Sequence, residues 1–195
     1  WPTVATAAGI VAGDLDGDGK TDLMVASADS GGVSGESLAY LAGNGDGSFA
    51  PGATIPTCGG PLQLVTADFN NDAVADLIAT CDRDQGITVL LRHADNSFDF
   101  SPLISEVAVP FKLAVGDFDR DGNIDIVATS RYGIAMILLG DGTGRFHKVA
   151  ELVGMLGGDC VVADFNADGI ADVAFSDPLN NILSIFAGAG DGSFA

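Results

Sequence analysis

The sequence DLDGDGKTD at residues 14–22 recurs three more times in altered form, and this recurrence decides the fold. The other copies are DFNNDAVAD at residues 68–76, DFDRDGNID at residues 117–125 and DFNADGIAD at residues 164–172. Their first residues lie 47 to 54 positions apart, so four such periods fill the 195-residue chain. A fixed period of this length indicates an array of structural repeats.

Each repeat has the same order of short apolar segments. One segment leads into the acidic loop and a second leaves it, at residues 23–26, 77–79, 126–128 and 173–175. The second segment is apolar throughout, which predicts a strand buried on both faces. A third segment ends in a turn rich in Gly, Asp and Asn that is followed by Phe, at residues 45–49, 94–98, 142–146 and 190–194. Such turns are typical of hairpins, and the Phe begins a fourth strand.

Four short antiparallel strands per period predict an all-β fold, a β-propeller of four-stranded blades in a single domain over residues 1–195. The repeats cover approximately residues 8–55, 62–109, 111–153 and 157–195. The near-integral number of periods favours a closed four-bladed ring, with residues 1–6 completing the last blade as an added strand. A piece of a larger propeller is the alternative. A sandwich of unrelated strands would not explain a loop that recurs in one phase.

The chain is strongly acidic, with 27 Asp and Glu against 8 Lys and Arg and a formal net charge of −19. Such a surface repels phosphate backbones and anionic membranes, so we expect neither nucleic-acid binding nor membrane insertion. About half of the acids lie in the four recurring loops. That clustering points to bound cations.

Each acidic loop offers oxygen atoms at alternate positions, counted from its first Asp. Side-chain oxygens at positions 1, 3, 5 and 9 and the main-chain carbonyl at position 7 converge if the loop curls, and calcium takes six to eight oxygen ligands. Without a cation, these crowded carboxylates would repel one another. The predicted ligands are Asp14, Asp16, Asp18, Lys20 and Asp22 in loop 1; Asp68, Asn70, Asp72, Val74 and Asp76 in loop 2; Asp117, Asp119, Asp121, Asn123 and Asp125 in loop 3; and Asp164, Asn166, Asp168, Ile170 and Asp172 in loop 4. Up to four calcium ions are expected.

The loops differ from an EF-hand, which requires a Glu at position 12 between helices. Position 12 is Val25, Ala79, Ala128 or Phe175 here, each on a predicted strand. Position 6 is Gly in three loops but Ala73 in loop 2. Because Ala tolerates a positive φ poorly, we expect loop 2 to hold calcium most weakly.

The acidic motif combined with GDGSF resembles the FG-GAP/VCBS repeats of integrin α-subunit propellers, fungal lectins of that fold and many secreted bacterial proteins. The resemblance covers essentially the whole chain. It implies a β-propeller with calcium in the loops between the first two strands of each blade. It also implies extracellular adhesion or recognition, although the seven blades typical of integrins exceed the four repeats found here.

Three cysteines permit at most one internal disulfide. Cys58 precedes one predicted strand and Cys81 ends the next strand of the same repeat, so we expect these two to be bonded. Cys160 lies in the apolar run at residues 160–163 and is expected to be a buried free thiol.

We expect no catalytic activity, because the chain contains no nucleophile elbow, phosphate loop or zinc-protease motif. A glycosidase-like pair of carboxylates is disfavoured because the clustered Asp residues are assigned to metal. The first functional hypothesis is an extracellular recognition or adhesion module for a glycan or a protein. The second is a structural subunit of an extracellular fibre or array that associates end to end. The third is a non-catalytic domain of a larger secreted enzyme.

Overall fold

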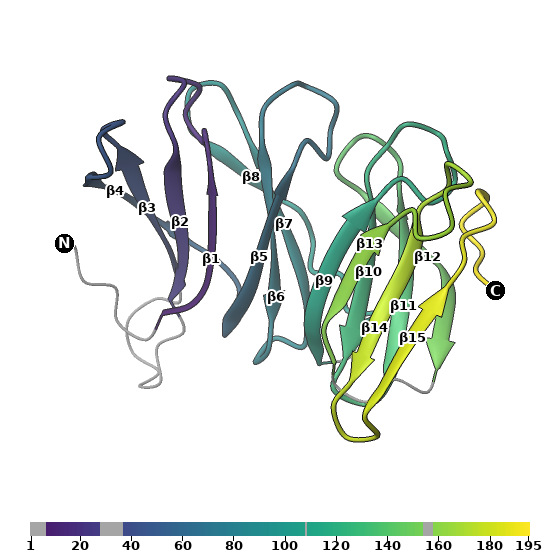
Figure 1. Ribbon diagram of the computed structural model, residues 1–195. Helices are drawn as coiled ribbons and strands as arrows, with labels where there is room; N and C mark the ends of the chain where they lie inside the picture. The colour runs from purple at the N-terminus through teal and green to yellow at the C-terminus, as the bar shows by residue number, and fades with distance from the viewer. Residues whose placement is uncertain (1–6, 28–36, 108, 154–157) are drawn as a thin grey trace. The chain divides into compact units, whose positions relative to one another are not determined.

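The computed structural model describes residues 7–27, 37–107, 109–153 and 158–195, and its regular structure is entirely β (Figure 1). The strands form four antiparallel sheets in which neighbours in sequence are neighbours in space. The chain divides into two compact units. The first unit contains the residues up to Asp68 together with Asp72–Leu103, and the second contains Phe69–Asn71 together with the residues from Ile104 onward.

The first unit holds two four-stranded sheets. Sheet 1 consists of β1 (Ala7–Gly13), β2 (Asp22–Ser27), β3 (Ser37–Gly43) and β4 (Phe49–Pro56). Sheet 2 consists of β5 (Pro61–Ala67), β6 (Asp76–Cys81), β7 (Gly86–Arg92) and β8 (Phe98–Phe100).

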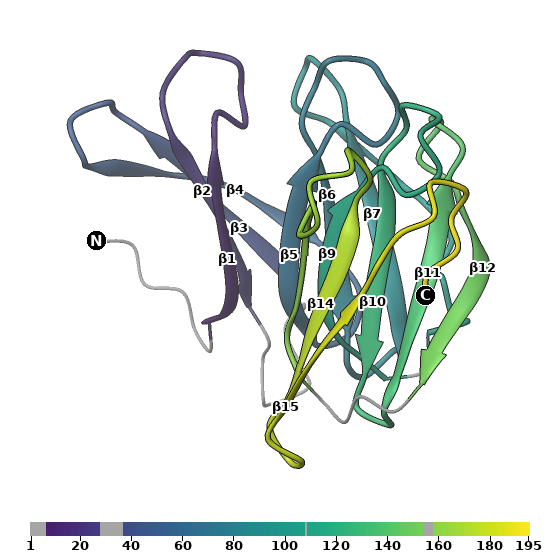
Figure 2. The same cartoon turned by 45° about the vertical axis from the view of Figure 1, so that its right-hand side comes forward.

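The second unit holds a four-stranded and a three-stranded sheet (Figure 2). Sheet 3 consists of β9 (Pro110–Gly116), β10 (Asp125–Ser130), β11 (Ile134–Gly140) and β12 (Phe146–Val153). Sheet 4 consists of β13 (Cys160–Ala163), β14 (Asp172–Asp177) and β15 (Ile182–Phe186). The described residues of sheet 4 thus show three of the four strands that the sequence predicts for each repeat.

A fourth strand only begins in sheet 4, because the chain pairs Gly188 with Phe194 and exchanges two hydrogen bonds between Ala187 and Ala195. Residues 1–6, the predicted completing strand, lie outside the described residues. The closed ring is therefore not confirmed.

The second strand of each sheet is buried as its continuous apolar sequence predicted. Every residue of β6 and of β10 is buried, and only one residue of β14 is exposed. These strands lie between two hydrogen-bonded neighbours and have packed side chains on both faces. They position the acidic loops, since each begins with the ninth residue of its motif.

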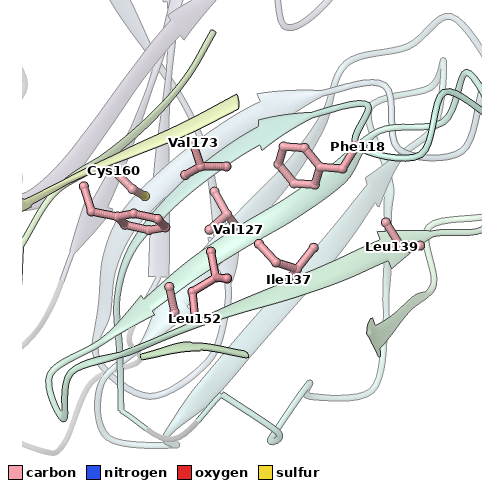
Figure 3. Packing of buried hydrophobic residues seen from close by; sticks show 9 residues of the cluster. Phe118, Val127, Ile137, Leu139, Leu152, Cys160 and Val173 are labelled. Carbon is pink, nitrogen blue, oxygen red and sulfur yellow. The ribbon is translucent and has the colours of Figure 1, made fainter. Parts of the chain in front are cut away.

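The core of the second unit lies between sheets 3 and 4 (Figure 3). Its buried residues are Phe118, Val127, Ala135, Ile137, Leu139, Leu152, Cys160, Val173 and Phe175. Two edge-to-face aromatic pairs extend it, Phe118 with Phe194 at 5.4 Å and Phe175 with Phe186 at 5.7 Å between ring centroids. Such pairs add about 0.5–1.5 kcal/mol beyond the burial of area.

The core of the first unit lies between sheets 1 and 2 and contains aliphatic residues where the second unit has rings. It includes Leu15, Met24, Leu38, Leu64 and Leu77. A cavity of about 60 Å³ remains here, lined by Leu15, Met24, Tyr40, Arg92 and Phe98 among others. Leu15 occupies the motif position that is Phe in the other three loops. The smaller side chain accounts for part of the empty space.

The expected disulfide is present, with Cys58 bonded to Cys81 in the first unit. It connects the segment before β5 to the end of β6. Cys160 is a buried free thiol, also as predicted. Burial raises the pKa of the Cys160 thiol, so the group is held in its protonated form.

Candidate metal centres

The four acidic loops occupy equivalent places, each between the first and second strands of its sheet. Their backbones adopt a left-handed conformation at position 6, with φ of 82° at Gly19, 87° at Gly122 and 81° at Gly169. Ala73 adopts the same conformation in loop 2, with φ of 65°. This strained alanine fulfils the backbone requirement that we inferred from the glycines of the other loops.

Position 4 is left-handed as well, which the sequence did not indicate. Its residues are Gly17, Asn71, Arg120 and Ala167, with φ between 59° and 80°. Only two of these, Gly and Asn, commonly adopt that conformation. The two left-handed residues bend the loop into a tight curl.

The curl directs main-chain N–H groups at the first Asp of each motif. The N–H of position 6 donates to Oδ2 of that Asp in every loop, over 2.8–3.1 Å. Position 7 donates its N–H to the carboxylate of position 5 over 2.7–2.9 Å. The main-chain carbonyls of Lys20, Val74, Asn123 and Ile170 remain predicted ligands.

Two loops bring three carboxylates together. In loop 1 these are Asp14, Asp16 and Asp18, and in loop 3 they are Asp117, Asp119 and Asp121. One oxygen from each carboxylate lies within 4.8 Å of the other two. Calcium ligands lie about 2.3–2.6 Å from the ion, so ligands on opposite sides are about 5 Å apart. The spacing of both triads fits a single calcium ion.

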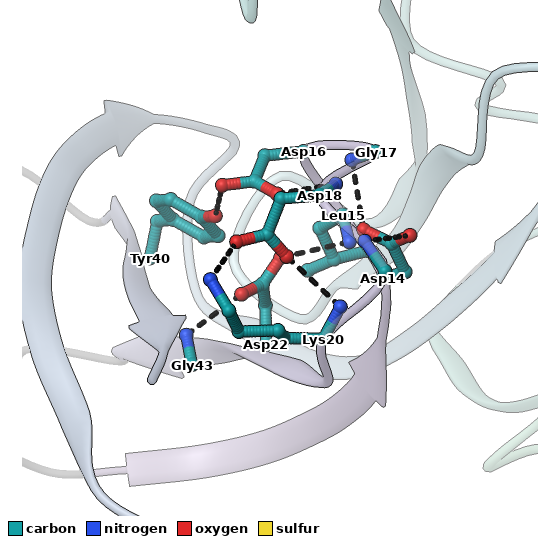
Figure 4. Close-up of polar contacts among 10 residues, drawn as sticks. Asp14, Leu15, Asp16, Gly17, Asp18, Lys20, Asp22, Tyr40 and Gly43 are labelled. Atoms are coloured by element: carbon teal, nitrogen blue, oxygen red, sulfur yellow. Dashed lines mark hydrogen bonds and ion pairs between the residues drawn. The ribbon is translucent and has the colours of Figure 1, made fainter. Parts of the chain in front are cut away.

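Two further polar side chains, from Lys20 and Tyr40, contact the carboxylates of loop 1 (Figure 4). The Lys20 ammonium lies 2.5 Å from Asp18 Oδ2, and the Tyr40 hydroxyl donates to Asp16 Oδ2 over 2.9 Å. The hydrogen bonds from Lys20 hold the pKa of Asp18 below its usual value. No motif predicts that Tyr40, which lies on β3, contacts the loop.

Loop 3 contains a buried oxygen that has no hydrogen-bond partner, Oδ1 of Asp117. Its other oxygen accepts the N–H of Gly122 over 3.1 Å. A buried, unpaired carboxylate oxygen costs about 1–3 kcal/mol or more. A cation bound by Asp117, Asp119 and Asp121 would supply the missing partner. Among the described loops, this is the donor set that fits calcium best.

Loops 2 and 4 have Asn at position 3, which leaves carboxylates at positions 1, 5 and 9. In loop 4, Asn166 Oδ1 accepts the N–H of Asp168 over 2.9 Å, and its amide nitrogen donates to Asp168 Oδ2. Backbone donors, chiefly the N–H of Gly169, hold the pKa of Asp164 below its usual value. The predicted ligands of these loops lie on the same curl with less negative charge.

The ninth-position Asp residues are buried and have a structural role that sequence reasoning missed. They are Asp22, Asp76, Asp125 and Asp172. In three loops, Oδ2 accepts the N–H of position 2 over 2.6–2.9 Å. In all four, Oδ1 accepts the N–H of a residue at or just after the end of the third strand segment, over 2.7–2.9 Å. This Asp clamp ties the loop to two parts of its own repeat.

The residue on the third strand that donates to the clamp lies very close to the backbone of the acidic loop. A Cβ at Gly43 would lie 2.0 Å from the carbonyl oxygen of Thr21, so a larger residue would collide there. Sheet 2 has Arg92 at this place, and its Nε donates to the corresponding carbonyl, that of Ala75, over 3.2 Å. In sheet 2 the side chain of Arg92 therefore hydrogen-bonds to the carbonyl that corresponds to the one beside Gly43.

The clamp residue of loop 3, Asp125, lies where burial disfavours the charged form of its carboxylate. Burial, together with the nearby charges of Asp119 and Asp121, raises the pKa of Asp125 to about 6 despite hydrogen bonds from Gly140 and Phe118. A bound cation would favour the charged form of all three groups.

The hairpin Asp residues Asp46, Asp95, Asp141 and Asp191 are also structural. Each accepts the hydroxyl of the Ser or Thr two positions later over 2.5–2.6 Å, together with that residue's N–H. The hydroxyl bond lowers the pKa of each carboxyl. The Asp-x-Ser/Thr spacing is the sequence signal of this turn.

Comparisons with known proteins agree with this repeat architecture. A family model described as an FG-GAP-like repeat matches residues 14–79 and 117–175. No curated protein sequence matches the chain.

Several solved structures resemble the whole chain at low sequence identity. A protein from Bacteroides uniformis, whose proposed activity is that of a 6-phosphogluconolactonase, has a TM-score of 0.70 and 17% identity. A protein from Lactobacillus plantarum has a TM-score of 0.69 and 11% identity. BBS1N, crystallised in complex with ARL6DN and soaked with lead, has a TM-score of 0.64 and 15% identity.

Each comparison covers 100% of this chain but only 55–56% of the other protein. The chain thus spans little more than half the length of these structures, and the likeness concerns the fold alone. Among the described residues, no helix is long and apolar enough to cross a membrane. The family match covers more than half of the sequence, and the matched segments contain all four acidic loops. The chain belongs to the FG-GAP-like repeat family and has an all-β, propeller-like fold.

Proposed function

We propose that this chain is an extracellular, calcium-binding recognition module without catalytic activity. The observation that carries the proposal is the carboxylate triad of loop 3, in which Asp117, Asp119 and Asp121 converge and one buried oxygen of Asp117 has no hydrogen-bond partner. The equivalent triad of loop 1 supports it. Calcium would neutralise these charges and hold each curl in place.

Calcium acts in this proposal as a ligand of the folded state. Extracellular calcium modules bind with dissociation constants of about 10⁻⁴–10⁻³ M. At ten times that concentration, one site stabilises the fold by about 1.4 kcal/mol, and four would contribute about 5–6 kcal/mol. Sites this weak stay empty at cytosolic calcium levels. The disulfide between Cys58 and Cys81 is also more usual outside the cytosol.

Recognition of a glycan or a protein would use the surface around the loops. An open depression beside loops 3 and 4 is lined by Asp117, Arg120, Asp164 and Ile170 among others. It combines carboxylates, a guanidinium and an aliphatic side chain, which suits a polar ligand such as a sugar. The alternative function, a structural subunit of an extracellular array, is favoured by an exposed apolar face on sheet 4.

Calcium binding is tested by titration calorimetry and by thermal melts with calcium or with a chelator. We expect Asp119→Asn and Asp121→Asn each to weaken one site and to reduce the calcium-dependent rise in melting temperature. The matched control is Asp141→Asn, which alters a hairpin Asp of the same unit. A calcium-loaded protein whose melt is unchanged by chelator would contradict the proposal.

Terbium luminescence tests ion binding at loop 1 separately, because the Tyr40 hydroxyl donates a hydrogen bond to Asp16. Terbium that replaces calcium in loop 1 should luminesce when Tyr40 is excited. The signal should fall in Tyr40→Phe and persist in Tyr132→Phe, the other tyrosine. Equal signals in both variants would place the ion elsewhere.

Recognition is tested by a glycan array with millimolar calcium and again with chelator. Specific binding that depends on calcium and is weakened by Arg120→Ala would support a lectin-like module. No binding in either condition would favour the structural alternative.

A further inference from the structure

The three clustered carboxylates of loop 1 are fully hydrogen-bonded by the protein itself (Figure 4). Asp14 accepts the main-chain N–H groups of positions 4 and 6, one on each oxygen. Asp16 accepts the N–H of Asp18 and the hydroxyl of Tyr40. Asp18 accepts the N–H of Lys20 on one oxygen and its ammonium on the other. Each carboxylate of this triad therefore has a donor on both of its oxygens.

The equivalent triad of loop 3 is less completely satisfied. Among the described residues, Oδ1 of Asp117 is buried and has no hydrogen-bond partner. The place of Tyr40, three residues before the clamp donor of its sheet, is taken in sheet 3 by Ile137. An aliphatic side chain has no group to donate. A cation would thus supply a missing partner in loop 3, whereas in loop 1 it would replace donors that are already present.

The residue at position 7 contacts the same carboxylate in both loops but differs in charge. The ammonium of Lys20 lies 2.5 Å from Oδ2 of Asp18. The amide of Asn123 donates to Oδ2 of Asp121 over 2.6 Å. The two contacts are equivalent, yet only Lys20 is positively charged. Its charge repels a second cation, and its ammonium uses an oxygen that would otherwise be a ligand.

The cationic residue of loop 3, Arg120, is not a counterpart of Lys20. It lies at position 4, and a Cβ at Gly190 in the turn after β15 would lie 3.0 Å from its Cδ. The described residues show no ion pair between its guanidinium and the triad of its own loop. The positions equivalent to Lys20 in loops 2 and 4 are the aliphatic residues Val74 and Ile170. Lys20 is therefore the only cation at position 7 among the four loops.

We propose, on the basis of the calcium binding proposed above, that the Lys20 ammonium competes with calcium for Asp18, so that loop 1 fills at a higher calcium concentration than loop 3. The side chain of Lys20 is 44% exposed, so it can leave Asp18 for solvent when calcium binds. Loop 1 keeps its curl at low calcium because Lys20 and Tyr40 satisfy its carboxylates. Loop 3 depends on calcium for the same purpose.

The size of the effect follows from the exposure of the ion pair. The side chain of Asp18 is 36% exposed, so water and salt screen its interaction with Lys20. We expect the dissociation constants of loops 1 and 3 to differ by about tenfold. The difference should narrow as the salt concentration rises, because the repulsion between Lys20 and calcium is screened.

The test is a calcium titration followed by the amide N–H signals of Gly19 and Gly122 in nuclear magnetic resonance spectra. Each of these groups donates to the first Asp of its own loop and therefore reports on that loop. The Gly122 signal should respond at about tenfold lower calcium than the Gly19 signal. Lys20→Met should strengthen binding at loop 1 about tenfold and leave loop 3 unchanged. The matched control Lys148→Met removes the same charge from β12 and should affect neither loop.

A reciprocal pair of variants tests whether charge at position 7 is sufficient. Asn123→Lys places an ammonium at the equivalent position of loop 3. Asn123→Met loses the same amide hydrogen bonds without adding a charge. Binding at loop 3 should be about tenfold weaker in Asn123→Lys than in Asn123→Met. Circular dichroism first shows that both variants are folded, and if Asn123→Lys is not, the Lys20→Met result alone decides.

Hydrogen exchange in chelator gives a measurement that does not require bound calcium. The Gly19 N–H should exchange more slowly than the Gly122 N–H, and Lys20→Met should reduce that protection. Calcium binding at loop 1 that is unchanged in Lys20→Met would overturn the proposed role of Lys20 and leave calcium binding itself intact. A chain in which neither glycine responds to calcium would overturn both proposals.

Discussion

In the second unit, the ring of Phe118 packs edge-to-face against Phe194, whereas in the first unit Leu15 lies near Phe98 beside a cavity of about 60 Å³. A main-chain bond accompanies the aromatic pair, because Gly192 donates its N–H to the carbonyl of Phe118 over 3.0 Å. The corresponding residue of the first unit, Asn96, donates to His93 within its own turn. One repeat architecture is thus filled in two ways.

The first unit, whose core contains the cavity, is cross-linked by a disulfide. Cys58 and Cys81 are bonded there, whereas the equivalent core of the second unit contains Cys160 as a free thiol. The backbone plan of a repeat is therefore maintained by its loops and hairpins. The side chains packed between sheets differ from one pair of sheets to the next.

The largest effect is expected from removing the aromatic packing. Phe118→Ala deletes a fully buried ring and should cost about 3–5 kcal/mol of unfolding free energy. Leu15→Ala should cost only about 2–3 kcal/mol, because its site already adjoins empty space. Hydrogen exchange followed peptide by peptide would assign each loss to its unit. Equal losses would contradict the idea that the two interfaces are packed differently.

The next effect concerns the disulfide. Replacing Cys58 and Cys81 together by Ser should cost about 3 kcal/mol, because the bond closes a loop between residues 23 positions apart. Protection from exchange should fall in β5–β8 and change little in β9–β12. A uniform loss over the whole chain would show that the two units unfold as one.

A smaller effect, of opposite sign, is expected from filling the cavity. Leu15→Phe places in loop 1 the ring that the other loops have, and should stabilise the chain by about 1–2 kcal/mol. The reciprocal change, Phe118→Leu, should destabilise it by a similar amount. Thermal melts in saturating calcium measure both. A destabilised Leu15→Phe would mean that the cavity walls cannot accept a ring.

The smallest effect is expected in loop 2, where Ala73 has φ of 65°. Ala73→Gly should stabilise the chain by about 0.5–1 kcal/mol and strengthen calcium binding at this loop. The control Ala163→Gly, on strand β13, should be destabilising. If both substitutions changed the free energy of unfolding in the same direction, backbone strain at position 6 would not be the cause of weak calcium binding at loop 2.

Much of the fold followed from the sequence because its signals are local and repeated. The apolar segment at residues 126–128 lies within β10, and the Gly and Asp residues at 190–192 form the expected turn. The pairing of Cys58 with Cys81 followed from the same strand assignments. The fourth strand of sheet 4 was predicted at residues 1–6, which lie outside the described residues. The pairing of Gly188 with Phe194 and of Ala187 with Ala195 was not predicted, because such isolated pairs have no local sequence signal.

The candidate site was predicted only in part. The triads of loops 1 and 3 converge as the alternating pattern suggested. The bond from Tyr40 to Asp16 depends on residues 24 positions apart, so no motif records it. Nor does the spacing of Asp22 reveal that its carboxylate accepts two main-chain N–H groups, because one donor, Gly43, lies on another strand.

The Asp clamp bears on the order in which the chain folds. Its two hydrogen bonds span 7 residues and 15 to 21 residues, so both are local contacts. Local contacts close quickly, because little chain entropy is lost in forming them. A repeat emerging from the ribosome can therefore tie its loop as soon as its third strand has been synthesised, before the next sheet exists. We therefore expect each loop and its three strands to form early, and the pairing of one sheet with the next to be slower.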